Sequence, residues 1–166
     1  TCALPIYYVN PLLGTATLWD SVDLGFKPTK RTWGAEVFPG SSLPNAMVQV
    51  SPVTKFHSGA GYQYEDSVIY GFTHTNKGHW NLCHIPLLPV TGTPLPGDYC
   101  SPYSHARESA APGYYRVFLD RYGVDAELTS TLRCAFHKYT YPAGAPAALL
   151  ADLQRSNEHV RAWDIR

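Results

Sequence analysis

The sequence predicts an all-β domain with the architecture of an antiparallel β-sandwich. Only 16% of its 166 residues are charged, whereas Tyr (12), Pro (14) and Gly (13) are abundant. That composition suits short strands joined by tight turns better than a helical bundle. Apolar and polar residues alternate with a period of two along 124–136, and no segment shows convincing helical periodicity. Strands at short spacing without intervening helices indicate a sandwich and not βαβ units.

The first part of the chain, 9–52, is rich in Gly, Pro and aromatic residues and should be mostly ordered loop. Its one strand-like run is 47–51. A β-branched and aromatic run at 67–72 predicts the next strand. The run at 85–90 predicts another, and its two prolines should confine it to a sheet edge.

The clearest strand signal lies in the second half. The alternation along 124–136 predicts one long strand with one wet face, and Cys134, on its apolar side, should be a buried free thiol. The run at 114–120 should pair with this strand as an antiparallel hairpin, with Gly123 in the short connection. A mostly apolar run at 147–153 predicts the last strand.

The two ends are interpreted separately from the sandwich, which is expected over 7–153. Residues 1–6 resemble translated sequencing-adapter read-through, so they are excluded from the fold and native sequence should begin near Tyr7. The polar stretch 154–166 has no terminating signal. It is expected to start a linker toward a further domain in a truncated reading frame.

Charge and hydropathy exclude two classes of partner. Lys+Arg and Asp+Glu are balanced at 13 each, so no basic face is expected to attract nucleic acid. No apolar run approaches the ~20 residues needed to span a bilayer, so no membrane span is expected. The four cysteines are weak support for a disulfide framework in a chain of this length.

The segment 72–84 is the leading candidate for a binding site. It holds three histidines, one tryptophan and two asparagines, which is too polar for a core strand, so it should be a surface loop. An aromatic face covers the C–H patch of a pyranose while amide and imidazole groups bond its hydroxyls, so this mixture suits sugar recognition. Trp80 is the strongest candidate contact. Alternatively, Trp80 packs into the end of the sandwich and the polar groups form turns.

The sequence contains two further candidate sites. His74, His79, Cys83 and His84 could bind zinc, but their spacing matches no paired Cys or His motif, so ordinary hydrogen bonds are the better interpretation. Gly40, in a Pro-Gly turn before a strand, could shape a pocket rim. The alternative is a turn that requires glycine at positive φ.

No catalytic set is evident. Glu65 and Asp66 are adjacent, and neighbours on a strand point to opposite faces, so they are poorly placed as a cooperating acid and base. The sequence therefore shows recognition chemistry without a catalytic pair.

Several sequence blocks follow one another in a fixed order: VNPLLGT at 9–15, FPG at 38–40 with LP at 43–44, MVQ at 47–49, SP at 51–52, GYQY at 61–64 with Asp66, IYGFTHT at 69–75, PGYY at 112–115, AELT at 126–129 and FHKY at 136–139. In this order they resemble the N-terminal domain of glycoside hydrolase family 92 α-mannosidases, across about 9–153. Ordered blocks are more specific than any single motif.

The resemblance implies a two-domain enzyme in which an N-terminal β-sandwich packs against an (α/α)6 barrel, with the active site between them. The family is exo-acting, calcium-dependent and inverting, and it removes terminal α-linked mannose from glycans. Inversion needs an acid and a base about 6.5–9.5 Å apart to admit a water. In the family both come from the second domain, as do the Ca²⁺ ligands, so no catalytic or metal-binding residue is expected in this chain.

The resemblance also implies which residues of this chain meet the sugar. The loop after His74 should reach the pocket, with Trp80 in the place of an aromatic residue or cysteine that meets the sugar in relatives. The full set of substrate-binding candidates is Trp80, His79, Asn76, Gly78, His74 and Gly40. The partners implied are a mannose-containing glycan and the chain's own C-terminal (α/α)6 domain, and the implied location is bacterial, periplasmic or secreted.

The loop departs from the family pattern, which keeps the linkage specificity open. Many relatives continue as Ser-Gly-x-Gly and then Gly-Asp-Leu, whereas this chain has different donors at 76–84, and these would select a different acceptor. The insertion at 20–31 has no assignment. Two other functions stay open: a freestanding mannose-binding module without catalysis, and a sandwich that only supports a neighbouring domain.

Overall fold

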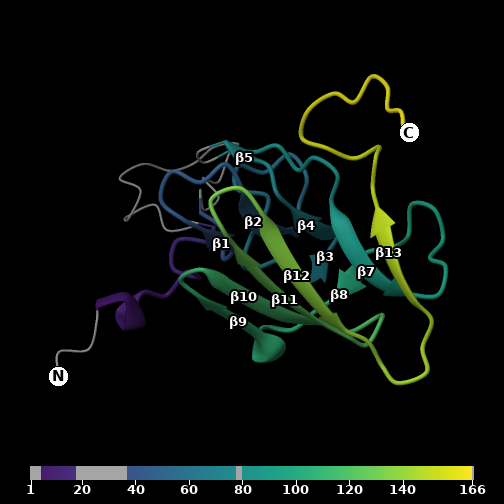
Figure 1. Ribbon diagram of the computed structural model, residues 1–166, viewed down its shortest axis with the longest axis horizontal. Helices are drawn as coiled ribbons and strands as arrows, with labels where there is room; N and C mark the ends of the chain where they lie inside the picture. The colour runs from purple at the N-terminus through teal and green to yellow at the C-terminus, as the bar shows by residue number, and fades with distance from the viewer. Residues whose placement is uncertain (1–4, 18–36, 78–79, 166) are drawn as a thin grey trace.

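The structure is a computed structural model that describes residues 5–17, 37–77 and 80–165. Gly78, His79, Cys2 and the insertion at 20–31 lie outside the described residues. Two antiparallel sheets form the body of the molecule (Figure 1). The helical turns in the described ranges are two short 3₁₀ segments, η1 (Pro5–Tyr8) and η2 (His105–Arg107). The prediction of an all-β sandwich is confirmed.

The first sheet has five strands and gathers segments from most of the chain. Its order is β1 (Ser41–Ser42), β2 (Gln49–Val53), β4 (Gly71–Thr73), β7 (Leu87–Thr91) and β13 (Ala147–Ala151). The predicted run at 67–72 is split at Tyr70 into β3 (Val68–Ile69) and β4, whose first residue, Gly71, has a φ of 154°. β3 pairs instead with β8 (Ser101–Pro102).

The second sheet is a four-stranded meander. Its order is β12 (Ala135–Thr140), β11 (Val124–Ser130), β10 (Tyr114–Leu119) and β9 (Glu108–Ala111). The predicted hairpin is confirmed as β10 and β11, with Gly123 at a φ of 64° in the connection. A third pair, β5 (Asn76–Lys77) and β6 (Trp80–Asn81), forms a small hairpin after β4.

The prediction of one strand over 124–136 was wrong. The chain turns at 131–134, where the backbone N–H of Thr131 donates to the carbonyl of Cys134 and the Thr131 hydroxyl accepts from the N–H of Cys134. β12 then runs back along β11. Cys134 is exposed in this turn, so its prediction as a buried thiol was also wrong, although the thiol is free.

The prediction of an edge strand at 85–90 was wrong for β7 as a whole, since β7 lies between β4 and β13. β4 pairs with β7 only through Phe72 and Leu87. Further along, β7 has β13 as its one paired neighbour, with Pro89 opposite Leu149. The missing N–H of Pro89 therefore interrupts no bond to β4.

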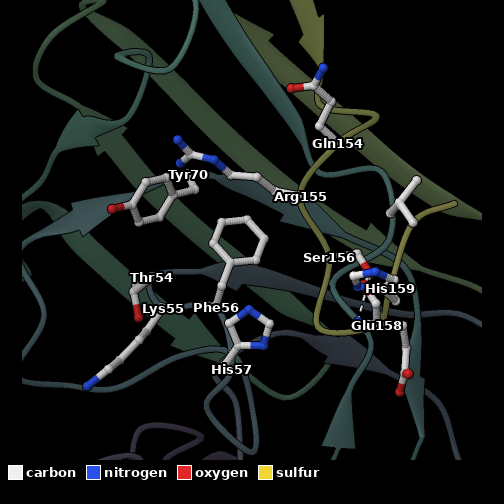
Figure 2. A pocket seen from close by; sticks show the side chains of 11 residues that line it. Thr54, Lys55, Phe56, His57, Tyr70, Gln154, Arg155, Ser156, Glu158 and His159 are labelled. Carbon is white, nitrogen blue, oxygen red and sulfur yellow. Dashed lines mark hydrogen bonds between the residues drawn. The ribbon is translucent and has the colours of Figure 1, made fainter. Parts of the chain in front are cut away.

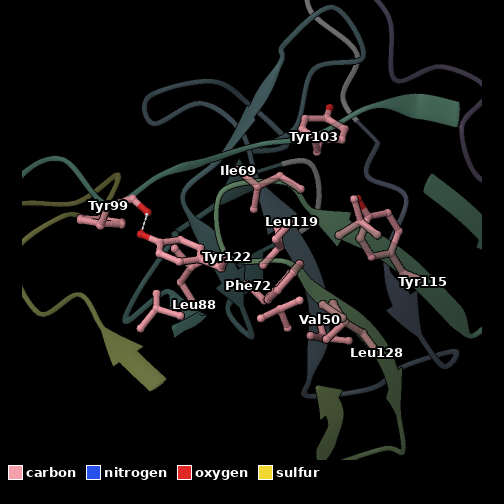
Figure 3. Packing of buried hydrophobic residues seen from close by; sticks show 14 of the residues in the cluster. Val50, Ile69, Phe72, Leu88, Tyr99, Tyr103, Tyr115, Leu119, Tyr122 and Leu128 are labelled. Atoms are coloured by element: carbon pink, nitrogen blue, oxygen red, sulfur yellow. Dashed lines mark hydrogen bonds between the residues drawn. The ribbon is translucent and has the colours of Figure 1, made fainter. Parts of the chain in front are cut away.

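The core lies between the sheets (Figure 3). Val50, Phe72 and Leu88 from the first sheet meet Leu119 and Leu128 from the second, and all are buried. Each such side chain contributes roughly 1.5–3 kcal/mol through removal of apolar surface from water. These contacts fix the two sheets relative to each other.

A buried carboxylate ties the tyrosines at one edge of this core. The Glu108 side chain is 0% exposed and accepts hydrogen bonds from the hydroxyls of Tyr62 (3.0 Å) and Tyr115 (2.6 Å), with Nδ1 of His105 at 2.5 Å. Burial and then the nearby charge of Glu108 raise the pKa of both tyrosines well above 10. Their hydroxyls stay protonated and keep donating to the carboxylate.

Candidate functional site

The hairpin β5–β6 carries the leading candidate, Trp80, at one end of the sandwich. It follows directly from β4, and Figure 1 shows β5 at the upper rim of the molecule. Its register pairs Asn76 with Asn81 and Lys77 with Trp80. A hairpin with two paired positions is not stable by itself, so contacts with the body must hold it.

Asn81 supplies the first of these contacts. Its side chain is buried, and its Nδ2 donates to Ser51 Oγ at 3.1 Å and to the carbonyl of Ala60 at 3.2 Å. Its Oδ1 accepts from the N–H of Cys83 at 2.9 Å, and its own N–H donates to the carbonyl of Gly59 at 2.8 Å. The base of the hairpin is therefore bonded to β2 and to the loop before β3.

Trp80 and Asn76 lie on opposite faces of the hairpin. Paired residues share a face and neighbours alternate, so Asn76 points inward with Asn81 while Trp80 points outward. Trp80 is half-buried, and its indole N–H has no hydrogen-bond partner among the described residues. The amide atoms of Asn76 are buried and also lack a partner there. The hairpin therefore does not bring the two predicted contacts together on one face.

His74 precedes the hairpin and joins the two sheets. Its Nε2 lies 2.8 Å from Nε2 of His137 on β12, whose Nδ1 lies 2.6 Å from the Tyr139 hydroxyl. Burial lowers the pKa of His74, and burial together with the charge of His74 lowers the pKa of His137 to about 4. Both rings are neutral at pH 7.

One arrangement of protons satisfies all three side chains in this hydrogen-bonded series. Tyr139 O–H donates to Nδ1 of His137, whose Nε2–H donates to Nε2 of His74. The reverse order would leave the Tyr139 hydroxyl hydrogen without an acceptor in the described part of the chain. His74 then carries its proton on Nδ1, where it can donate to a ligand hydroxyl.

Gly40 is a glycine because of close packing. A Cβ there would lie 2.0 Å from the carbonyl oxygen of Val50 on β2, and Gly40 is not among the residues with positive φ. The prediction that this turn needs glycine for a positive φ was therefore wrong, because the close approach to β2 is what requires glycine. Gly40 fixes the approach of β1 to β2, and its predicted contact with sugar stays a prediction.

The acidic pair has structural partners. Glu65 accepts from the N–H of Thr17 at 2.7 Å, and Asp66 accepts from the Thr54 hydroxyl at 2.7 Å. In the part of the chain that the structure describes, no group of three or more His, Cys, Asp or Glu side chains could hold a metal ion. The described donors therefore offer no fit for Ca²⁺ or zinc.

Two residues near the hairpin were missed in the sequence. The alternation of His137 with Tyr139 could have placed both on one face of a strand, but nothing in the sequence places His137 beside His74. Asn157 carried no signal, because it lies in a polar stretch interpreted as linker. Its amide reaches Asn81 and its backbone reaches Leu82.

A hollow of about 630 Å³ lies between the segment after β2 and the C-terminal segment. Figure 2 shows Phe56 between Tyr70 and His57, with Arg155 beside Tyr70. The Arg155 guanidinium lies 5.4 Å from the centre of the Tyr70 ring. None of the predicted site residues that the structure describes lines this hollow.

Comparison with known proteins identifies the family. The model of the glycosyl hydrolase family 92 N-terminal domain matches residues 8–166. The chain belongs to this family. No curated protein matches the sequence.

Two solved GH92 structures are similar to this chain. One is an α-mannosidase from Bacteroides thetaiotaomicron in complex with mannoimidazole, with 32% identity and a TM-score of 0.73, covering 91% of this chain and 20% of that one. The other is an inverting mannosidase from Bacteroides thetaiotaomicron VPI-5482, with 25% identity and a TM-score of 0.72, covering 92% of this chain and 20% of that one. The GH92 chain described here thus spans about a fifth of their length. No helix in its described ranges is long and apolar enough to cross a membrane.

Proposed function

We propose that this GH92 chain is the N-terminal domain of a calcium-dependent, inverting exo-α-mannosidase that removes terminal α-linked mannose from glycans. In this proposal the domain contributes a substrate-contacting loop and the second domain contributes the acid and the base. The observation that carries it is Trp80, held on the outward face of an anchored hairpin with its indole N–H unpaired among the described residues. An indole face in that position can cover the C–H face of a mannose ring.

The acids of the described residues support a division of labour between two domains. Glu108 is buried under two tyrosines, and Glu65 and Asp66 bond to threonines. Other acids pair with cations: Arg107 with Asp120, Arg116 with Asp125, Arg121 with Asp98, and Lys138 with Glu127. These carboxylates have structural partners, so the proposal assigns the catalytic acids and the Ca²⁺ ligands to the second domain, as the resemblance implies.

An apolar surface beside the hairpin supports the docking of that domain. Met47 is 75% exposed, Leu132 53% and Phe136 62%. The N–H of Met47 donates to the carbonyl of Leu132, and Gln49 donates to the carbonyl of His74, so this surface adjoins the candidate site. Exposed apolar side chains gathered at one end mark an interaction site. We propose that the (α/α)6 domain covers them, and that the enzyme is periplasmic or secreted in a bacterium.

The test is the activity of the full-length protein. It should hydrolyse an aryl α-mannoside, and NMR of the early product should show the β-anomer of mannose, since inversion places the water on the opposite face. Chelation should abolish turnover and added Ca²⁺ should restore it. Release of α-mannose, or turnover that survives chelation, would contradict the mechanism, and no turnover on any α-mannoside would contradict the activity.

The freestanding mannose-binding module remains the second candidate, because this chain itself supplies the core and the anchors of the hairpin. Calorimetric titration of this chain with mannose and mannobiose separates the two. Saturable binding by the isolated chain favours the module, whereas no heat at millimolar sugar favours a site that needs both domains.

A further inference from the structure

Asn157 uses nearly all of its hydrogen-bonding capacity on the segments around the Trp80 hairpin. Its Nδ2 donates to the carbonyl of Asn81 at 2.5 Å and to that of Ser58 at 3.5 Å. Its Oδ1 accepts from the N–H of His57 at 2.5 Å, and its own N–H donates to the carbonyl of Leu82 at 2.9 Å. The residue is buried, with 9% of its surface exposed. One side chain therefore bridges β6 and the loop after β2.

The bond to Asn81 meets the hairpin on the strand that carries Trp80. The Asn81 side chain donates to Ser51 and Ala60, and the backbone carbonyl of Asn81 accepts from Asn157. The residue next to Trp80 is therefore held through both its side chain and its backbone. β5 and β6 share only two paired positions. These outside bonds, more than the hairpin's own ladder, determine where the indole lies.

We propose that Asn157 is a positioning residue for sugar binding, which locks the Trp80 hairpin through Asn81 and makes the C-terminal segment and the hairpin one rigid unit. This rests on the proposed function, in which Trp80 meets the sugar. The amide of Asn157 touches no substrate. It acts through the backbone at Asn81 and Leu82.

The test uses Asn157→Asp in the full-length enzyme. The carboxylate keeps the size of the side chain and the acceptor for His57, but it loses the donor to Asn81 and sets a negative charge against two carbonyl oxygens. We expect KM for an aryl α-mannoside to rise by about tenfold, the factor that one lost hydrogen bond of this kind implies, with kcat nearly unchanged. Asn157→Ala, which adds no charge, should shift KM in the same direction.

Amide hydrogen exchange provides the readout that a general loss of stability would not reproduce. The N–H groups of Asn81 and Leu82, bonded to Gly59 and Thr75, should exchange faster in the variant, while those of β10 and β11 stay protected. The matched control is Glu158→Gln, an exposed neighbour in the same segment, which should change neither KM nor exchange.

Three results would overturn the proposal: unchanged exchange at Asn81 and Leu82, equal loss of protection in β10 and β11, or a loosened hairpin with unchanged KM. The variant Trp80→Ala separates this failure from that of the proposed function. If Trp80→Ala leaves KM unchanged, the sugar contact fails, and the exchange rates then decide whether Asn157 holds the hairpin.

Discussion

His74 and His137 join the two sheets, with their Nε2 atoms 2.8 Å apart. Two imidazoles at this distance share one hydrogen, so the two facing nitrogens cannot both carry a proton while the bond is kept. The pair connects the end of β4, where the candidate hairpin begins, to β12 of the second sheet. Its protonation therefore affects both the stability of the fold and the base of the site.

Acid should weaken the fold through this pair. The folded pKa of His137 is about 4, against an ordinary value of 6.5, so the unfolded chain binds more protons between these values. Stability should fall as the pH drops from about 6.5 to about 4 and change little through this group below that. Between pH 4 and 6.5 the urea midpoint should fall less steeply with decreasing pH for His137→Gln than for wild type. The control His159→Gln replaces an exposed imidazole away from the pair and should keep the slope; an unchanged slope in His137→Gln would refute the assignment.

Replacing Trp80 by alanine in the full-length enzyme should raise KM, at a cost in kcat/KM of roughly 1–3 kcal/mol, the scale of a lost stacking contact. Steady-state kinetics on an aryl α-mannoside measures it. Trp163→Ala is the matched control, since Trp163 is 57% exposed on the C-terminal segment. Equal kcat/KM for Trp80→Ala and wild type would favour a purely supporting sandwich.

Gly40→Ala should destabilise the domain by about 1–3 kcal/mol or more, since its methyl group would overlap the carbonyl oxygen of Val50. Gly144→Ala offers a comparison, because Gly144 has a φ of 76° and open space around it. Its cost should be about 1–2 kcal/mol from backbone conformation alone. Thermal unfolding measures both, and a Gly40→Ala variant as stable as wild type would contradict the close approach.

Glu108→Gln should destabilise the chain by about 1–3 kcal/mol, because one amide oxygen cannot accept from both tyrosines and His105, so one of these three groups loses its acceptor. Glu127→Gln is the surface counterpart. Glu127 bonds Tyr114 and the exposed Lys138, and its loss should cost less than about 1 kcal/mol. Urea unfolding compares them, and similar midpoints would show that the buried network adds nothing.

The cysteines should differ sharply in reactivity. Burial raises the pKa of the Cys83 thiol to about 12, whereas Cys134 is exposed in the turn between β11 and β12. Under native conditions a thiol reagent should label Cys134 within minutes and leave Cys83 unlabelled until the chain unfolds. Mass spectrometry of the digested protein locates the label. Early labelling of Cys83 would contradict its burial.

The local features of the fold could be predicted, and the long-range ones could not. Alternation and Gly123 were enough to predict the β10–β11 hairpin. The turn at 131–134 was missed because it contains no Gly, Pro, Asn or Asp and is closed by the Thr131 hydroxyl, so alternation runs through it. The place of β7 depends on a partner about sixty residues away, which periodicity does not reveal.

For the candidate site, the types of residue could be predicted, but the directions in which their side chains point could not. The polar and aromatic segment after Phe72 was expected at the surface, and the structure forms a hairpin there. That Asn76 and Trp80 face opposite ways follows from a register the sequence leaves undetermined. The contacts of His137 and Asn157 join segments 63 and 76 residues apart, so only the folded chain brings them together.

The span of these contacts also affects how the domain is made on the ribosome. β7 has no partner along most of its length until β13 is synthesised, and the Asn81 carbonyl on the Trp80 strand lacks its bond to Asn157 until that residue follows. The β9–β12 meander can form early from local pairs. The five-stranded sheet and the hairpin should instead be completed late, and apolar strand edges should stay unpaired during translation. Slower elongation after residue 157 should therefore raise the yield of soluble protein.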